Sequence, residues 1–255
     1  MEKNYKKLLK KCGRASADYN MLEEGDHVLI GLSGGIDSLM LSHILYDLQK
    51  RAPFDFKIST VTFNPLFSGF NINILSSYIK EQKWIHYITE CNVKEILHQH
   101  DAQKRPCALC SRLRRGKLQE LMRETKCNKL ALGHHLDDVA ASFLISLFRG
   151  QGITTMGPNV PALGGEFRII RPLIYATKEL INTVASKNFE FPKSGKCIYD
   201  NYLKETGDRY WAEQLIDNID KTRIKDVRSA ILNSLKNVQT DFLLDTKFLK
   251  DVPKN

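Results

Sequence analysis

The chain has 255 residues, of which 42% are hydrophobic and 26% are charged. This balance is typical of a globular protein with one main domain and a sizeable core. No apolar run approaches the roughly 18 residues that a membrane-spanning helix needs. The N-terminus also lacks the apolar stretch of a secretory signal. We therefore expect a cytoplasmic protein with no membrane partner.

The net charge of +9 is concentrated in two segments. Residues 104–129 hold nine Lys or Arg against two Glu, and residues 1–14 hold six Lys or Arg against one Glu. Such clusters are the usual electrostatic footprint of polyanion binding, because each neutralised phosphate releases counterions. A solvated helix face gives the same pattern. Charge alone therefore leaves nucleic-acid binding open.

The first 25 residues are predicted to form a basic amphipathic helix. The apolar run His27–Leu32 then suits a buried parallel strand, and a glycine-rich turn follows it. Apolar residues repeat at helical spacing from Asp37 to Leu48. The chain thus opens with a helix and then a strand, turn and helix.

Strands and helices continue to alternate along the rest of the chain. The predicted strands are 57–64, 84–89, 128–133 and 167–173, and the predicted helices are 71–82, 111–126, 136–149, 177–188, 210–216 and 227–238. This alternation predicts an α/β fold with a doubly wound, mostly parallel sheet, in which ligands collect at the carboxyl ends of the strands. We divide the chain into a basic helical segment (1–25), an α/β domain (26–195) and a helical C-terminal extension (196–255).

The turn after the first strand reads Ser33-Gly34-Gly35-Ile36-Asp37-Ser38. Glycines let backbone N–H groups approach an anion, and the helix N-terminus adds its partial positive charge. Ser33 and Ser38 can donate hydroxyls to phosphate oxygens, and Asp37 can hold Mg²⁺. A plain turn with an Asp or Ser cap is the alternative. The loop lacks the Gly-Lys-Ser/Thr ending of a Walker loop, which favours a grip on pyrophosphate over γ-phosphate transfer.

A second polar segment, Gly133-His134-His135-Leu136-Asp137-Asp138, follows a later predicted strand. It resembles the Gly-His-His/Asn-x-Asp-Asp segment that accompanies the glycine turn in the PP-loop superfamily, where the acidic pair helps to place metal and nucleotide. The alternative is a helix start whose two acids are favoured by the helix dipole. His134 and His135 could equally be packed or solvent-facing residues.

Cys107 and Cys110 form a Cys-x-x-Cys pair beside Arg112, Arg114 and Arg115. In a reducing compartment such cysteines serve metal binding or thiolate chemistry rather than disulfides. Two thiolates at this spacing can face one metal or cluster, and the nearby arginines are expected to lower the thiol pKa. Structural zinc, a redox pair, an iron–sulfur cluster and chance all stay open.

A third ligand has to come from elsewhere in the chain. Cys197 is the best candidate, because it lies in a Gly- and Lys-containing loop where the chain can fold back. Cys12, Cys91 and Cys127 are predicted to be small buried apolar residues. Three thiolates with no fourth ligand would leave an iron site open to exogenous sulfur, whereas structural zinc needs four ligands.

Together these motifs resemble the tRNA 2-thiocytidine synthetase family of iron–sulfur PP-loop enzymes. The likeness covers nearly the whole chain and includes Cys107–Gly116, Ala131–His135 and Ile170–Leu173. It implies the adenine nucleotide alpha hydrolase-like fold of PP-loop pyrophosphatases. It also implies that ATP adenylates the C2 oxygen of cytidine 32 in tRNA, after which sulfide from a cluster displaces AMP.

The resemblance also assigns roles to residues and partners. It implies catalytic roles for Asp37 and Arg114, a 4Fe-4S cluster on Cys107, Cys110 and Cys197, and ATP and Mg²⁺ binding by Ser33, Gly34, Gly35, Asp37, Ser38, Gly133, His134, Asp137 and Asp138. The implied partners are tRNA, a sulfur donor of the cysteine desulfurase type and a second copy of the chain in a homodimer.

Two positions depart from the family pattern. The usual lysine inside the glycine turn is Ile36, which removes one positive charge near the phosphates, and the usual second Cys-x-x-Cys is reduced to Cys197. Two other hypotheses therefore stay open. One is a tRNA-modifying PP-loop ligase without sulfur chemistry, similar to lysidine synthetase. The other is a nucleotide- or RNA-binding module whose cysteines hold zinc.

Overall fold

The computed structural model describes residues 2–67, 69–99, 106–195, 197 and 207–248. Within them the strands form one six-stranded sheet in the order β3-β2-β1-β4-β6-β5. Neighbouring strands are parallel except β5, which runs antiparallel to β6. The strands are β1 (His27–Leu32), β2 (Lys57–Asn64), β3 (His86–Glu90), β4 (Lys129–Ala131), β5 (Asn159–Pro161) and β6 (Arg168–Ile170).

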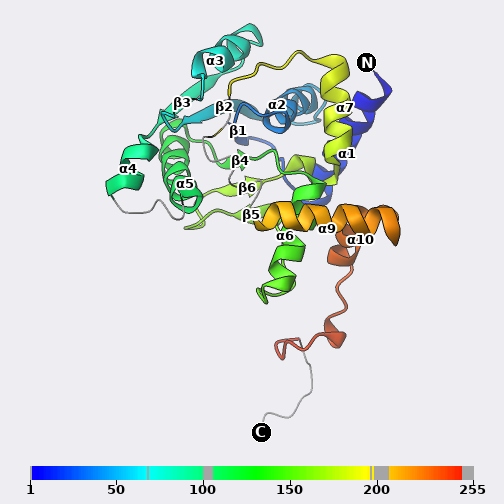
Figure 1. Ribbon diagram of the computed structural model, residues 1–255. Helices are drawn as coiled ribbons and strands as arrows, with labels where there is room; N and C mark the ends of the chain where they lie inside the picture. Colours follow the sequence, from blue (N-terminus) through cyan, green and yellow to red (C-terminus); the bar gives the residue numbers. More distant parts are fainter. Residues whose placement is uncertain (1, 68, 100–105, 196, 198–206, 249–255) are drawn as a thin grey trace.

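Helices surround this sheet and extend beyond it (Figure 1). They are α1 (Lys3–Asp18), α2 (Ile36–Gln49), α3 (Ile72–Glu81), α4 (Val93–Gln99), α5 (Pro106–Thr125), α6 (Leu136–Phe148), α7 (Lys178–Asn188), α9 (Asp208–Thr222) and α10 (Val227–Lys236), with short 3-10 turns η2 (Pro172–Tyr175) and η3 (Thr240–Phe242). None of the described helices is both long and apolar enough to cross a membrane.

The central strand β1 is buried on both faces, which explains its continuous apolar sequence. Val28 and Ile30 belong to the main core, to which α1, α2 and α7 contribute. Leu29 points to the other face, where it joins Leu118 and Met122 of α5. Side chains of a strand alternate between faces, so one apolar run serves both layers. The prediction of a doubly wound, mostly parallel sheet is confirmed.

Helix α1 packs an apolar stripe into this main core. Leu8 and Cys12 are fully buried, whereas the lysines on the other side of the helix face outward. The helix ends at Asp18 rather than near residue 25, because Asn20 has a φ of 47° and turns the chain. Left-handed backbone of this kind suits Asn and stops a helix.

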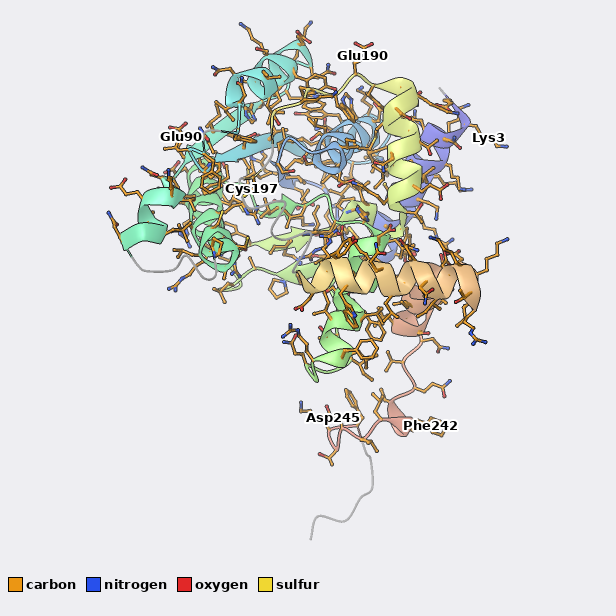
Figure 2. The ribbon with its side chains drawn as sticks, in the orientation of Figure 1. Lys3, Glu90, Glu190, Cys197, Phe242 and Asp245 are labelled. Carbon is orange, nitrogen blue, oxygen red and sulfur yellow. The ribbon has the colours of Figure 1, made fainter. Side chains whose placement is uncertain are left out.

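The C-terminal helices add a separate apolar cluster on the outer side of α6. Ala212 and Ile216 of α9 pack against Ala140 and Leu144 of α6, and α10 contributes Val227. After α10 the chain runs away from the body, as Figure 2 shows for Phe242 and Asp245. The proposed division at residues 25 and 195 stays a prediction.

The structure also differs from the predicted elements elsewhere along the chain. The strand predicted at 167–173 stops at Ile170 and a 3-10 turn begins at Pro172, which has no N–H for the sheet ladder. The short elements α4 and β5 carry no clear periodicity and were missed. Helix α5 begins at Pro106, five residues before its predicted start, so the Cys-x-x-Cys pair lies inside a helix rather than ahead of it.

Candidate active site

The candidate active site lies where the order of the sheet reverses. Strands β1 and β4 are neighbours, with Ile30 paired to Ala131. In the sheet, β2 and β3 lie outward of β1, and β6 and β5 lie on the opposite side, outward of β4. Ligands of open α/β sheets bind at such a switch point, outside the carboxyl ends of the strands. The loops there are the two motifs predicted to bind nucleotide, residues 33–38 and 133–138, which we call the nucleotide half.

The first loop is closed on itself by its serines. The Ser38 hydroxyl donates to the carbonyl of Gly35 over 2.9 Å and accepts from the amide of Ser33 over 3.2 Å. Gly34 has a φ of +79°, a conformation that other residues rarely adopt. Gly35 is the N-cap of α2, whose first amides have no acceptor inside the helix and are available to an anion.

The second loop packs tightly against the first. A Cβ at Gly133 would lie 3.0 Å from the carbonyl carbon of Asp37 and 3.1 Å from the amide nitrogen of Ser38. These distances are shorter than ordinary contacts with a side chain, so the end of β4 approaches α2 this closely only because residue 133 is glycine. The two predicted motifs are therefore brought together by the fold.

Three carboxylates meet around the buried ring of His135. Its Nε2 lies 4.0 Å from Asp37 and 3.5 Å from Asp138, and its Nδ1 lies 3.3 Å from Asp137. The Asp138 carboxylate also accepts a 2.7 Å hydrogen bond from the backbone amide of His135 and so caps α6. Carboxylate oxygens are the ligands that Mg²⁺ prefers, but among the described residues these three do not converge on a single metal position.

Each of these carboxylates has a basic partner that sequence reasoning missed. Lys178 lies 2.6 Å from both oxygens of Asp37, and Arg228 lies 2.6 Å from Asp137. Arg209 pairs with the buried carboxylate of Asp138. The three basic residues begin α7, α9 and α10 or lie in their first turn, 71 to 141 positions beyond the acids that they meet. No local pattern could have indicated them.

The titration of the nucleotide half follows from these contacts. Burial alone would raise the pKa of Asp137, but hydrogen bonds from His135 and from the amide of Lys178, with the charge of Arg228, lower the pKa to about 2. Burial lowers the pKa of His134 to about 4 against the opposing charge of Asp138. Its Nδ1 accepts a 3.1 Å hydrogen bond from Arg171. At neutral pH the site thus holds an ionised Asp137 and a neutral His134.

Cys107, Cys110 and Cys197 form a second group, which we call the thiol half. Cys107 and Cys110 are one turn apart at the start of α5, and Arg114 lies one turn further on the same side of the helix. Cys197 is close enough to influence the pKa of both. Figure 2 shows Cys197 on the side of the sheet near α5.

A single loop joins the two halves. Ser194 lies against the glycine turn, since a Cβ at Gly34 would be 2.0 Å from its hydroxyl oxygen. The Ser194 carbonyl accepts from the amide of Asn71 over 2.7 Å, and Gly195 forms a bridge with Phe70. Three residues beyond Ser194 is Cys197, which lies close enough to the thiols of α5 to influence their pKa values. The same segment therefore covers the candidate phosphate site and carries the third thiol.

The thiols of Cys107 and Cys110 lose their protons less readily than the sequence suggested. The pKa of Cys110 is raised, chiefly by burial and also by the neighbouring thiols of Cys197, Cys107 and Cys91, and Arg114 only partly offsets this. The expectation of lowered thiol pKa values was wrong. Among the described residues no three Cys, His, Asp or Glu side chains stand together as an assembled metal site. The donor set still fits a metal cluster in its chemistry, because soft thiolates are the ligands that such clusters prefer.

The other cysteines behave differently from one another. Cys12 and Cys127 are buried in apolar clusters, as predicted. Cys91 is half-buried and packs in the apolar cluster that also holds Cys110. It is therefore a fourth thiol beside the thiol half, which the sequence pattern did not single out.

Comparison with known proteins decides the family. Residues 1–193 match the PP-loop domain family. The chain is 35% identical over 255 residues to the tRNA-cytidine(32) 2-sulfurtransferase of Geobacter sulfurreducens, covering 98% of this chain and 97% of that protein. It belongs to the tRNA-cytidine(32) 2-sulfurtransferase family of PP-loop proteins. The protein of the same description from Geobacter metallireducens is 34% identical over 248 residues, covering 96% and 94% of the two chains. The family predicted from the motifs is confirmed.

A solved structure supports the fold independently. The U34-tRNA thiolase NcsA from Methanococcus maripaludis, solved with its 4Fe-4S cluster, superposes with a TM-score of 0.70 at 22% identity. The match covers 92% of this chain and 81% of that chain. At this identity the comparison establishes the shared architecture. The adenine nucleotide alpha hydrolase-like fold expected from the sequence is thus confirmed.

Proposed function

We propose that the protein is an ATP-dependent sulfurtransferase that converts cytidine 32 of tRNA to 2-thiocytidine. One observation supports the proposal: Cys197 lies close enough to Cys107 and Cys110 to influence their pKa values, and it follows Ser194, which packs against the glycine turn, by three residues. A ligase without sulfur chemistry has no use for a thiol group joined to its nucleotide site. A zinc module would require four ligands in a closed site.

The first step uses the nucleotide half. The C2 oxygen of cytidine attacks the α-phosphorus of ATP, and the bond to the bridging oxygen breaks so that pyrophosphate leaves. The free amides at the start of α2 bind the departing pyrophosphate. Ser33 donates its hydroxyl to the same phosphates, and Ser38 does so once its proton turns from the Gly35 carbonyl to a phosphate oxygen. Asp37, with Asp137 and Asp138, would hold Mg²⁺ against the same phosphates. Gly133 and His134 line the same nucleotide site.

The second step uses the thiol half. A sulfur atom at the oxidation level of sulfide attacks C2, the carbon–oxygen bond breaks, and AMP leaves with the original oxygen. Cys107, Cys110 and Cys197 would hold a 4Fe-4S cluster, which supplies an iron position for that sulfur when bound. Arg114 then stabilises negative charge on the leaving phosphate. Sulfur from a desulfurase-type persulfide must also gain two electrons, from a thiol reductant.

The proposal extends to the partners of the protein. The exposed arginine face of α5, which includes Arg112 and Arg115, suits the phosphates of tRNA. Phe148 is 61% exposed and meets the half-exposed Trp211 edge to face at 5.5 Å. An aromatic patch of this kind is typical of protein interfaces, which supports a homodimer. We expect the dimer to act in the cytoplasm on bulk tRNA.

The proposal is tested by the nucleosides of cellular tRNA. Deletion of the gene should remove 2-thiocytidine from bulk tRNA, as measured by mass spectrometry, and the wild-type gene should restore it. Cys107→Ala should not restore it, and its protein purified without oxygen should lose iron and sulfide. A nucleoside profile unchanged by the deletion would refute a role in tRNA thiolation, and a colourless, zinc-loaded wild-type protein would favour the binding module.

A further inference from the structure

The glycine turn of this chain lacks a cation of its own. Ile36 occupies the first position of α2, where the PP-loop pattern places lysine, and it is 40% exposed. A triphosphate brings several negative charges to the same place. Backbone amides and a helix dipole offset only part of them. The question is which residue supplies the missing positive charge.

Lys178 lies at the required position. Its ammonium group is 2.6 Å from each oxygen of Asp37, the residue that directly follows Ile36. The Lys178 side chain is 38% exposed, so its ammonium group is accessible to a ligand bound at the glycine turn. The sequence separates Lys178 from the glycine turn by about 140 residues, and only the packing of α7 beside α2 brings them together.

The position of Lys178 is fixed at two points. Its backbone amide donates to Asp137 over 2.8 Å, while its side chain holds Asp37. Thr177 caps α7 by accepting from the amide of Leu180 over 3.2 Å. One residue thus links both acidic motifs of the nucleotide half. A cation held in place before the ligand arrives loses little freedom on binding.

The ammonium group keeps a free donor. A lysine has three N–H donors, and two of them are directed at the oxygens of Asp37. Across the described part of the chain, Nζ of Lys178 has no other hydrogen-bond acceptor. We propose that Lys178 binds the triphosphate of ATP and supplies the charge that the glycine turn lacks at Ile36. This inference rests on the proposed use of ATP.

The experiment is a comparison of ATP affinities by isothermal titration calorimetry at fixed Mg²⁺, with protein purified without oxygen. Lys178→Met should weaken ATP binding about tenfold or more, which corresponds to losing one charged hydrogen bond. Lys178→Arg should retain most of the affinity. The double variant Lys178→Met with Ile36→Lys should regain most of it, because the charge returns from the neighbouring helix position.

Two controls separate phosphate binding from a structural role. Lys187→Met removes an exposed lysine near the other end of the same helix and should leave ATP affinity unchanged. AMP lacks the β- and γ-phosphates, so its affinity should fall much less than that of ATP in Lys178→Met. Thermal unfolding of every variant shows whether the fold is kept, and Lys178→Gln replaces Lys178→Met if the latter is unfolded.

Clear results would overturn the proposal. Lys178 is not a phosphate ligand if its removal leaves ATP affinity within about twofold of wild type. Equal losses for ATP and AMP, or a double variant no better than the single one, would assign Lys178 to the structure of the site instead. If the wild-type protein itself binds no ATP, the proposed function fails rather than the role of Lys178.

Discussion

The two halves of the site differ in how completely the polypeptide builds them. In the nucleotide half every carboxylate has a basic partner, and glycines hold two loops in close contact. In the thiol half burial raises the pKa values of Cys107 and Cys110, and among the described residues these two thiols and Cys197 do not form an assembled metal site. The fold itself brings the two loops of the nucleotide half together, whereas we propose that the thiol half is completed only by the cluster that binds there.

The difference has a physical origin. Loops at the switch point are fixed by the ends of two paired strands, so their geometry comes with the sheet. The thiols come from the start of a helix and from a loop almost 90 residues later in the chain. Thiols become good ligands only on losing their protons, and metal binding drives that loss. Changes in the two halves should therefore have separable effects.

The largest effect should come from removing a thiol. Cys110→Ala should abolish formation of 2-thiocytidine in tRNA while leaving the ATP dissociation constant within about twofold of wild type. The matched control is Cys127→Ala, which removes a buried thiol from the apolar cluster on α5 and β4. The measurements are nucleoside mass spectrometry and calorimetric ATP titration. Loss of ATP binding in Cys110→Ala would show that the halves are not separable.

The next effect concerns the pH dependence of stability. The pKa of His134 is about 4 in the folded protein, below the ordinary 6.5, so the unfolded chain binds more protons between these values. The contribution to stability is complete above pH 6.5 and is lost as pH falls through 4. For a pKa shift of this size, the contribution of His134 to the free energy of unfolding is about 3 kcal/mol.

Urea unfolding between pH 7 and pH 4 measures this contribution. In His134→Gln the unfolding free energy should fall less steeply as the pH is lowered from 7 to 4. Some of the fall should remain, because burial also lowers the pKa values of His43 and His86 to about 4. Cys107→Ala, a change in the thiol half, should leave the slope of unfolding free energy against pH unchanged. An unchanged slope in His134→Gln would mean that this ring titrates normally.

A smaller effect is expected from breaking an ion pair of the nucleotide half. Arg209→Ala leaves the buried carboxylate of Asp138 without its partner. Because Arg209 is half-exposed and solvent screens the pair, we expect a cost of about 2 kcal/mol, which lowers Tm by roughly 5 °C. Arg223→Ala, at the other end of the same helix, is the control. Equal melting temperatures for the two variants would show that the ion pair between Arg209 and Asp138 does not stabilise the fold.

The smallest effect should come from the arginine face of α5. Arg112→Ala should weaken tRNA binding about two- to threefold at physiological salt. It should also reduce the slope of the logarithm of the binding constant against the logarithm of salt concentration by about one. Filter binding over a range of salt concentrations measures both quantities. ATP affinity should not change. A salt slope equal to that of wild type would place the tRNA elsewhere on the surface.

Much of the fold was predictable from the sequence, because its main signals are local. The apolar run His27–Leu32, the glycine turn and the helical repeat after Asp37 are each encoded by neighbouring residues, and all three elements are present. The mostly parallel, doubly wound sheet also followed, since alternation of strands and helices leaves few topologies. Short elements such as α4, with seven residues, carry too little periodicity to be recognised.

The site was predictable only in part, for the same reason. Asp37, Asp137 and Asp138 belong to local motifs and meet as the sheet requires. Lys178 and Arg209 are ordinary charged residues on polar helices, and only the packing of α7 and α9 brings them to these acids. The thiol pKa values were misjudged because the arginines beside the cysteines in sequence are exposed, while the thiols themselves are half-buried. The catalytic roles of Asp37 and Arg114 stay predictions.

The central claim is that the two halves work in one reaction, and stoichiometry tests it most directly. Protein reconstituted with iron and sulfide should be incubated with ATP, a thiol reductant, a sulfide source and a tRNA that carries cytidine 32. The account predicts one AMP for each 2-thiocytidine formed, with neither product in Asp37→Asn and no 2-thiocytidine in Cys110→Ala. Formation of 2-thiocytidine without AMP, or steady AMP formation with no thiolated base in the wild-type protein, would contradict it.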